Sequence, residues 1–419
     1  MKNEQRTVSF FLILMTIFPI VDVLNGYVLS MHYSLPVGVI YRMICFLFLV
    51  IAILLYGFRQ NLYTMLTFST IFVCGILLLI QSIVLSHTPE MIFQDSVVLI
   101  KFYLWLLIPY FVYQHQQILR TVNYDKIFVI ISFLFTIGLL IPYFLNVGNQ
   151  TYENSAAGYK GFYFATNDTT LAFIVASTFT GWYLVKKVGN KSGIKVFGLL
   201  ALYFGNMLCL LLLATKTGIL YGIILTASLF IYFVFFQNKI PTVYRVMISA
   251  VAFIFIIFIF FNGRQFIVEA TVGTINRITY FYKLFDGDLV RLITSSRSDY
   301  LQGGWNYFIQ SNHPFLIPLI GFGFEYRLLH FGRIGLIEMD FFDLLFSFGL
   351  IGLVIVTIMI IYFATLSLKK QSRTIYSITY LVLLIYGFMA GHVFFSALST
   401  TLLGLVCGGI ILKQGEDCK

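Results

Sequence analysis

Long runs of apolar residues, separated by short polar stretches, follow one another along most of the 419-residue chain. A helix satisfies its own backbone hydrogen bonds inside lipid, and about 20 apolar residues are enough to cross the hydrocarbon core. At that length per crossing, the pattern predicts an all-α, polytopic membrane protein with about twelve transmembrane helices. The apolar runs fall at 8–28, 36–57, 62–85, 95–113, 126–145, 167–185, 194–213, 218–236, 244–262, 341–367, 374–391 and 393–412.

The first run could be a cleaved signal peptide, and the last two runs could form one helix or two. Lys2 and Arg6 precede the first run, as in a signal peptide, but no small-residue cleavage site follows it. We therefore expect a retained first helix. Gly391 and His392 join the last two runs, which together exceed the roughly 20 residues of one crossing, so two helices are expected there.

Basic residues collect at alternate connections between the predicted spans. Cytoplasmic connections of membrane proteins carry an excess of Lys and Arg, so this pattern places both termini in the cytoplasm. The basic residues of these connections are Arg59, Arg120, Lys126, Lys186, Lys187, Lys191, Lys195, Lys239, Arg245, Lys369, Lys370 and Arg373. Among the short connections on the other side, only Lys160 and Lys216 are basic.

One long connection, 263–340, lies between the ninth and tenth predicted spans. Long loops translocate largely regardless of charge, so its basic residues agree with an extracytoplasmic position. Its first part, 264–285, mixes apolar and basic residues and is expected to form a helix on the membrane surface. The chain therefore divides into helices 1–9 (1–262), a partly helical outer loop carrying part of the active site (263–340), and helices 10–12 with a short cytoplasmic tail (341–419).

The composition excludes a soluble globular domain. Hydrophobic residues make up 59% and charged residues 11%, and the mean hydropathy is +0.91, whereas soluble domains are roughly half apolar and one quarter charged. The net charge of +10 is a topology signal here and does not indicate nucleic-acid binding. The five cysteines are scattered and predict neither a disulfide framework nor a metal site.

Lys216 lies in Thr215–Lys216–Thr217–Gly218, a short outer turn between two spans. An ammonium group, neighbouring hydroxyls and the free amides of a helix start can together bind a diphosphate. The alternative is a lysine that extends to lipid headgroups. Both interpretations stay open on the sequence alone.

Arg297 lies in Ser296–Arg297–Ser298–Asp299–Tyr300, where a helix that continues through Trp305 and Tyr307 is expected to begin. A guanidinium group can donate two directed hydrogen bonds to phosphate oxygens, which suits recognition of a lipid diphosphate. The alternative is an ion pair, with Asp299 or with another part of the loop.

Three acidic residues, Glu338, Asp340 and Asp343, crowd the point where the long loop re-enters the membrane. Acids in a first helical turn commonly cap the helix or interact with its dipole. Three acids exceed that need, and like-charge crowding with partial burial can raise the pKa of one of them toward that of a general base. We prefer Asp340 as the base, with Glu338 as the alternative.

Two further polar motifs lie on the predicted outer side. Lys160 and Asn167 stand at the entry to the sixth span, where a helix cap and a ligand contact are both compatible with the sequence. Asp286–Gly287–Asp288 has the form of a metal-binding Asp-x-Asp, but we interpret this short pattern as a loop turn.

With these residues, the chain resembles the O-antigen polymerase and O-antigen ligase superfamily, membrane glycosyltransferases that use undecaprenyl-diphosphate-linked glycans. The resemblance covers residues 158–352 and is a similarity of layout. Its residues are Lys160, Gly161, Phe162 and Asn167, then Thr215 to Gly218 with Lys in place of the family's Arg, then Arg297, Pro314, Gly321, Gly323, Gly349 and Gly352. Ligases usually place a His before the last of these helices, whereas this chain has Glu338 and Asp340, which favours a polymerase.

The resemblance implies a metal-independent enzyme on the outer face of the bacterial cytoplasmic membrane. It would join lipid-diphosphate-linked repeat units, as donor and acceptor, into O-antigen, capsule or exopolysaccharide. Lys216, Arg297 and Lys160 would bind the diphosphate, and Asp340 or Glu338 would accept the proton. The residues expected to contact the glycan are Asn167, Trp305, Tyr307 and Tyr326. Neither a cofactor nor nucleic acid is expected, and a flippase and a chain-length regulator are the expected protein partners.

Three alternatives stay open. The first is a ligase that moves the finished glycan to another acceptor. The sequence separates it from a polymerase only by the missing histidine. A secondary transporter usually shows internal repeats and helices interrupted at mid-bilayer, and neither is clear in this sequence. A structural membrane subunit is the third alternative.

Overall fold

The computed structural model describes residues 2–33, 35–152, 157–188, 193–236, 276, 279–311, 313–369 and 374–414. These residues are mainly helical and belong to two compact units. The first unit contains Met1–Val21, Leu35–Tyr124 and Asp288–Lys419, and the second contains Asp22–Ser34 and Asp125–Gly287. Helix α1 contributes to both units.

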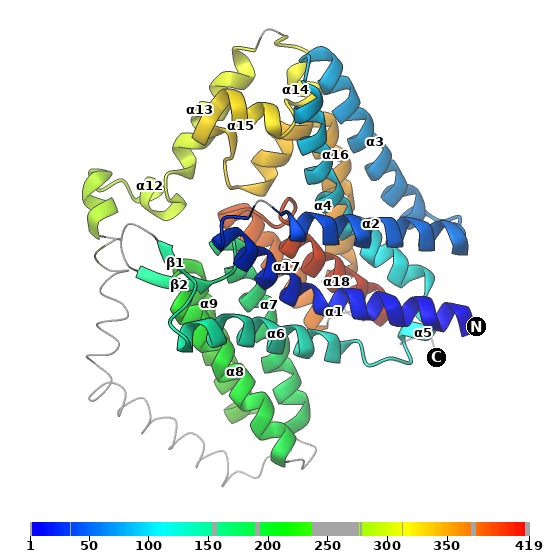
Figure 1. The fold of residues 1–419 in the computed structure, drawn as a ribbon, viewed down its shortest axis with the longest axis vertical. Coiled ribbons are helices and arrows are strands. Elements are labelled where there is room, and N and C mark those ends of the chain that lie inside the picture. The colour runs from blue at the N-terminus through cyan, green and yellow to red at the C-terminus, as the bar shows by residue number, and fades with distance from the viewer. Residues whose placement is uncertain are drawn as a thin grey trace. The chain divides into compact units, whose positions relative to one another are not determined.

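The first unit is built around the buried helix α4, which packs against α2, α3 and α18 (Figure 1). Asn61 and Thr88 cap α3 and α4, because their side-chain oxygens accept backbone N–H groups of the first turn. The long helices of this unit are α1 (Lys2–Ser30), α2 (Val37–Tyr56), α3 (Leu62–Val84), α4 (Pro89–Gln114), α16 (Asp340–Leu368), α17 (Ile375–Ala390) and α18 (Ala397–Lys413), and a short α5 (Gln116–Leu119) follows α4.

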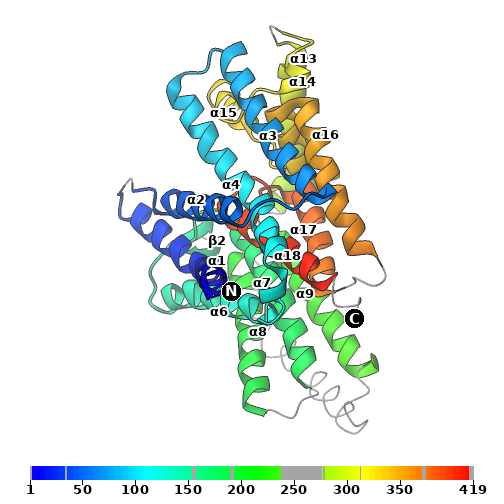
Figure 2. The ribbon, with the colours of Figure 1, turned by 90° about the vertical axis from the view of Figure 1, so that its right-hand side faces the viewer.

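The described part of the long loop folds into a layer of short helices with its own apolar core. The elements of this layer are α12 (Leu289–Thr294), α13 (Arg297–Ile309), α14 (Ile317–Ile320), α15 (Glu325–Phe331) and the 3-10 helix η2 (Gly332–Gly335). Its core consists of Phe308, Ile317, Phe322, Ile337 and Phe346. Figure 2 shows this layer beside one end of α3, α4 and α16. The expected helix through Trp305 and Tyr307 is confirmed by α13.

The turn expected at Asp286–Gly287–Asp288 is also confirmed. Asp286 and Gly287 both have positive φ angles, of 49° and 80°. Asp288 caps α12, because its carboxylate accepts the N–H groups of Val290 and Arg291 at 2.8 and 3.1 Å. The helix expected over 264–285 lies mostly outside the described residues.

Helix α16 is interrupted at Gly349, a break that the sequence pattern did not predict. Gly349 has φ 65° and ψ −170°, a conformation that is essentially restricted to glycine. A Cβ atom at Gly349 would lie 2.3 Å from the Leu319 carbonyl, so the break lets α14 approach closely. Residues 350–368 are 19 residues long and can span about 28 Å on their own, so the break lies toward the N-terminal end of the helix, outside the length needed for one crossing.

The second unit contains a helix bundle and a small β-hairpin. Its helices are α6 (Asp125–Phe144), α7 (Thr166–Val188), α8 (Gly193–Leu213) and α9 (Lys216–Ile231), which continues as the π-helix η1 (Tyr232–Phe236). Strands β1 (Asn149–Tyr152) and β2 (Ala157–Gly161) pair antiparallel, with Tyr152 opposite Ala157. This hairpin adds two short strands to a mainly helical fold, which agrees with the all-α class predicted from the sequence. Positive φ angles at Gly148, Gly158 and Gly161 permit the hairpin between α6 and α7.

A buried polar network joins three helices of the second unit. The Asn206 side chain on α8 donates to Ser132 of α6 at 2.8 Å and to Thr180 of α7 at 3.3 Å, and it accepts from Thr136 at 2.9 Å. Ser132 and Thr180 also contact each other at 2.9 Å. In lipid, such interhelical bonds hold helices together without a hydrophobic driving force.

Replacing Asn206 with leucine is expected to lower the stability of the second unit. The substitution removes three side-chain hydrogen bonds, at about 0.6 to 2 kcal/mol each in a membrane protein. Thermal unfolding in detergent checks this expectation. Ser228→Ala is the control, because the exposed Ser228 hydroxyl bonds to the carbonyl of Ile224 in its own helix. Equal unfolding temperatures for the two variants would show that the network contributes little.

Among the described residues, 8 helices are long and apolar enough to cross a membrane. The protein is therefore a multi-pass membrane protein. Eleven of the predicted spans coincide with helices, although α7 is too polar to meet the criterion and α17 and α18 are shorter than 18 residues. The span expected at 244–262 lies outside the described residues, so the total of about twelve stays a prediction.

Two connections of the first unit contact opposite ends of α4, as expected when successive helices cross a membrane in alternating directions. Near its start, Asp95 binds the backbone of Phe324 from the long loop. At its end, the carbonyl of Gln114 accepts from Arg59, in the connection between α2 and α3, at 3.0 Å. Asp95 and Gln114 are separated by 19 residues, or about 28 Å, close to the thickness of the hydrocarbon core. Which end faces the cytoplasm stays a prediction.

Candidate functional site

Arg297, the first residue of α13, binds both an acidic residue and the end of a helix. Its Nη2 atom donates to Oε2 of Glu338 at 2.7 Å. Its Nη1 and Nη2 atoms also donate to the carbonyls of Met389 and Ala390, at 3.2 and 3.4 Å. These carbonyls end α17, where the helix dipole favours a cation. The Arg297 side chain is 12% exposed and that of Glu338 39% exposed.

The turn that follows α17 completes this cluster. The Nε2 atom of His392 lies 4.0 Å from Oε1 of Glu338. Asp340 is fully buried, and its Oδ2 atom accepts the N–H of Val393 at 2.8 Å. Within the described ranges, its Oδ1 atom has no hydrogen-bond partner. Asp340 therefore anchors the turn to the start of α16. We call Arg297, Glu338, Asp340 and His392 the charged cluster.

The structure thus brings together Arg297, Glu338 and Asp340, three of the residues selected from the sequence that lie in this unit. Of the two ion pairs considered for Arg297, the one with Asp299 is not formed, because Asp299 binds Arg291 at 2.8 Å. The pair with another part of the loop is formed, with Glu338. His392 was not selected, although an ionisable residue beside Gly391 in a predicted outer turn was a usable signal.

Asp343, the third acid of this segment, has a different partner. Its Oδ1 atom accepts from Nη2 of Arg327 at 2.7 Å and from the N–H of Ile337 at 3.0 Å. Arg327 also donates to Oγ of Ser347 at 2.6 Å. Arg327 and Asp343 are both buried, so this pair locks α15 against α16 and fixes the segment that leads into Glu338.

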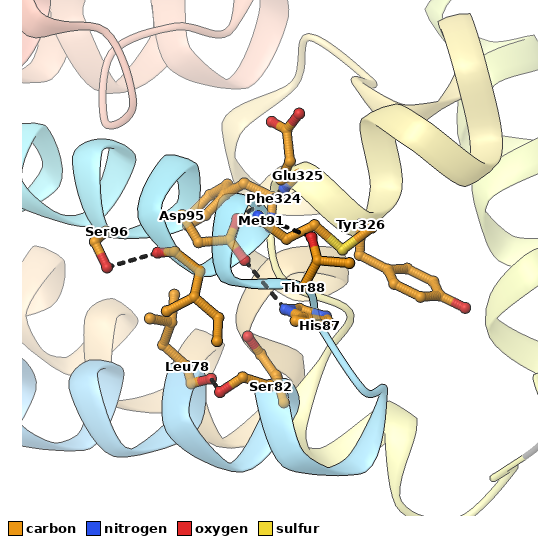
Figure 3. Close-up of polar contacts among 12 residues, drawn as sticks. Leu78, Ser82, His87, Thr88, Met91, Asp95, Ser96, Phe324, Glu325 and Tyr326 are labelled. Atoms are coloured by element: carbon orange, nitrogen blue, oxygen red, sulfur yellow. Dashed lines mark hydrogen bonds and ion pairs between the residues drawn. The ribbon is translucent and has the colours of Figure 1, made fainter.

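Asp95 holds the start of α15 from the side of α4. Figure 3 shows its carboxylate between two backbone N–H groups and an imidazole ring. Oδ1 accepts from Phe324 at 2.9 Å and from Glu325 at 2.7 Å, and Oδ2 lies 3.5 Å from Nδ1 of His87. Burial, with the negative charges of Asp95 and Glu90, raises the pKa of Glu325 above its ordinary value.

A cavity of about 290 Å³ opens between α13, α15 and the end of α3. Its lining residues are Val84, Leu85, Ser86, Tyr307, Gln310, Ser311, His313, Ile317, Phe322, Tyr326 and Phe331. Tyr307 and Tyr326, two of the aromatic residues expected to contact a glycan, therefore lie on one cavity. Trp305, the third, is half exposed on α13 and is not part of the lining.

The remaining selected residues belong to the second unit. Lys160, on β2, donates to the carbonyl of Phe164 at 3.2 Å. Asn167 is the second residue of α7 and so lies inside the first turn, not at the cap. Lys216 is exposed and opens α9.

These three residues lie on elements that pack together. The backbone of Gly158 on β2 approaches the carbonyl of Leu213 at the end of α8. The hydroxyls of Thr170 on α7 and of Thr215, which caps α9, are 3.0 Å apart. Within the second unit, the hairpin, the start of α7 and the turn before α9 therefore meet at one end of the bundle.

The fold and the charged cluster define a multi-pass helical membrane protein with a group of charged residues where the starts of α13 and α16 meet the turn after α17. Residues 276–416 match the family model described as O-antigen ligase like membrane protein. This match covers about one third of the chain and confirms the resemblance to the O-antigen polymerase and ligase superfamily. Comparison with curated proteins and with solved structures finds no match.

The matched segment contains the whole charged cluster and most of the cavity lining. The match to this family supports a glycan-transferring function in the membrane. Within the described ranges, no group of three His, Cys, Asp or Glu residues is arranged to hold a metal ion.

Proposed function

We propose that the protein is a polysaccharide polymerase that joins undecaprenyl-diphosphate-linked repeat units on the outer face of the bacterial cytoplasmic membrane. The observation that carries the proposal is the charged cluster inside the family-matched segment. It places the guanidinium group of Arg297 beside the accessible carboxylate of Glu338. A cation that could bind a diphosphate, Arg297, is thus in contact with a carboxylate that could accept a proton, Glu338.

In the proposed reaction, a hydroxyl group of the acceptor glycan attacks the anomeric carbon of the donor sugar. The new glycosidic bond forms as the bond between that carbon and the diphosphate oxygen breaks, and the lipid diphosphate leaves with the bonding electrons. Arg297 stabilises the charge that develops on the departing diphosphate. The proton of the attacking hydroxyl passes to the carboxylate of Glu338.

Burial favours Glu338 over Asp340 as the proposed base. Asp340 is fully buried and holds the N–H of Val393, whereas Glu338 is 39% exposed. A base must reach the hydroxyl that it deprotonates. We therefore assign the base to Glu338, in place of the preferred Asp340, and propose that Asp340 positions the turn that carries His392.

The other residues and partners stay predictions. Lys160 and Lys216 are proposed to bind diphosphate, and Asn167 is proposed to contact glycan, from the second unit. Lipid-linked oligosaccharide is the proposed donor and acceptor, and a flippase and a chain-length regulator are the proposed protein partners. The family match favours glycan transfer over the secondary transporter and the structural subunit considered above.

An O-antigen ligase is the second candidate, and one observation favours it. In the sequence, the absence of a His before the helix that begins at Asp340 favours a polymerase over a ligase. In the fold, His392 lies 4.0 Å from Glu338, so a histidine is present in the cluster through another segment. A ligase would transfer the finished glycan from the lipid diphosphate to a different acceptor.

Replacing Glu338 with glutamine is expected to reduce long polymer to single repeat units, because glutamine cannot accept the proton. Gel electrophoresis of surface glycans from a deletion strain carrying the variant measures this change. Asp299→Asn is the matched control, since Asp299 is an exposed partner of Arg291 outside the cluster. It should leave chain length unchanged.

The two candidate functions give different products in this experiment. Loss of a polymerase leaves single repeat units, whereas loss of a ligase leaves long chains attached to lipid diphosphate. Wild-type chain length in the Glu338→Gln strain would remove Glu338 from the mechanism.

A further inference from the structure

The cavity between α13, α15 and the end of α3 has an uncharged lining that is both aromatic and polar. None of the described residues that line it is Asp, Glu, Lys or Arg. The lining combines aromatic rings with the amide of Gln310, the hydroxyls of Ser86 and Ser311, and the imidazole of His313. Such a site suits a neutral ligand that has both apolar faces and hydroxyl groups.

Sugar rings have this dual character. Their C–H faces pack on aromatic rings, and their hydroxyls pair with amides and hydroxyls, which both donate and accept hydrogen bonds. Tyr307 is 41% exposed and has one ring face stacked on Phe331, with centroids 4.1 Å apart. The volume of about 290 Å³ is at the small end of ligand pockets. A cavity of this size suits one or two sugar residues better than a whole repeat unit.

The aromatic wall around Tyr326 is held in place by its neighbours. Tyr326 stacks on Phe322, and its ring also lies nearly parallel to those of His87 and His330, at centroid distances of 5.5 and 3.9 Å. In Figure 3, the His87 ring lies close to the carboxylate of Asp95. A wall fixed before binding lowers the entropic cost of holding a ligand.

The position of the cavity relates it to the charged cluster. Arg297 begins α13 and Tyr307 lies ten residues further along the same helix, or about 15 Å at the rise of an α-helix. A glycan whose reacting end lies at Arg297 and Glu338 can therefore extend along α13 toward the cavity.

We propose that this cavity is a glycan subsite that binds one or two neutral sugars of the donor or acceptor chain, remote from the bond being formed. The inference rests on the proposed function, which supplies the glycan at the charged cluster. Tyr307 provides the stacking surface, and Gln310 provides the directional hydrogen bonds.

The test is a binding measurement that needs no catalysis. Oligosaccharides of one, two and three repeat units, released by mild acid from the surface polysaccharide of the host strain, are added to the purified full-length protein in detergent. Saturation-transfer NMR and titration give the affinity. Tyr307→Ala and Gln310→Ala are each expected to weaken binding about tenfold, which corresponds to about 1.4 kcal/mol.

Two further variants make the result specific to the cavity. Gln302→Ala removes an exposed amide from the same helix but outside the lining, and it should bind as the wild type does. Tyr307→Phe keeps the stacking ring and should retain binding, which separates loss of the site from loss of folding. Wild-type affinity in both Tyr307→Ala and Gln310→Ala overturns the proposal, as does an equal loss in Gln302→Ala.

Failure of the subsite and failure of the proposed function are distinguishable. If Tyr307→Ala loses binding while Glu338→Gln cells make normal polymer, the subsite stands and the proposed mechanism fails. If Glu338→Gln cells lose polymer while Tyr307→Ala binds normally, the subsite alone is rejected.

Discussion

Cells that carry Arg297→Ala as their only copy of the protein are expected to lose long polymer and to accumulate single repeat units. Arg297 is the cation of the charged cluster, and its fork is already directed at an acidic oxygen of Glu338. Removing one group that stabilises developing negative charge typically costs about 10²-fold to 10³-fold in rate. Gel electrophoresis of surface glycans, with immunoblotting for the amount of protein in membranes, measures both effects.

Arg291 supplies a matched control for this experiment. It lies six residues before Arg297, on the neighbouring helix α12, and binds Asp299 in an exposed ion pair. Arg291→Ala should therefore leave chain length unchanged. Arg297→Lys keeps the charge but loses the planar fork, so an intermediate chain length is expected. Normal polymer in Arg297→Ala membranes would mean that the arginine only joins α13 to the end of α17.

The largest effect on stability is expected for Arg327→Met. Arg327 and Asp343 form a buried ion pair at 2.7 Å, and Arg327 also binds Ser347. Removing one partner leaves a buried charge without compensation, which typically costs about 3–5 kcal/mol. Thermal unfolding of the purified protein in detergent measures this loss.

The double variant Arg327→Met with Asp343→Leu tests the physical reason. Replacing both charges by apolar groups removes the unpaired charge, so part of the stability should return. Arg291→Met, in an exposed pair, should change the free energy of unfolding by no more than about 1 kcal/mol. If Arg291→Met and Arg327→Met destabilise the protein equally, burial is not what gives the inner pair its importance.

The transmembrane helices were predictable because lipid imposes their length and their composition. Helices α2, α3 and α6 end within a few residues of the predicted spans. The turn before Lys216 was predictable for the same reason, since a polar gap must separate two apolar runs. Local capping chemistry supports these starts, as Asn61 and Thr88 illustrate.

The break in α16 and the β-hairpin could not be predicted from the hydrophobic pattern. Residues 341–367 form a largely apolar run without proline, and only the close approach of Gly321 to Gly349 explains why the helix is interrupted there. The hairpin at 149–161 depends on packing of β2 against α8. Both features arise from contacts between segments far apart in the sequence, which a run of hydrophobic residues does not encode.

The candidate site was predictable in part. Glu338 and Asp340 were identifiable because three acids crowd one helix start, which exceeds the needs of a cap, and Arg297 was identifiable because a guanidinium group suits phosphate oxygens. Their geometry was not, because Arg297 and Ala390 are 93 residues apart in the chain and meet only in the fold. For the same reason, the sequence did not reveal that Asp340 is buried while Glu338 reaches the surface.

The most direct test of the central claim uses the purified protein in liposomes with lipid-diphosphate-linked repeat units extracted from a strain that lacks it. Mass spectrometry then follows the lipid-linked glycans over time. The account predicts lipid-linked dimers and longer chains, with one lipid diphosphate released for each new linkage, and neither product with Arg297→Ala or Glu338→Gln. Repeat units that stay single with the wild-type protein, or equal products with both variants, would contradict it.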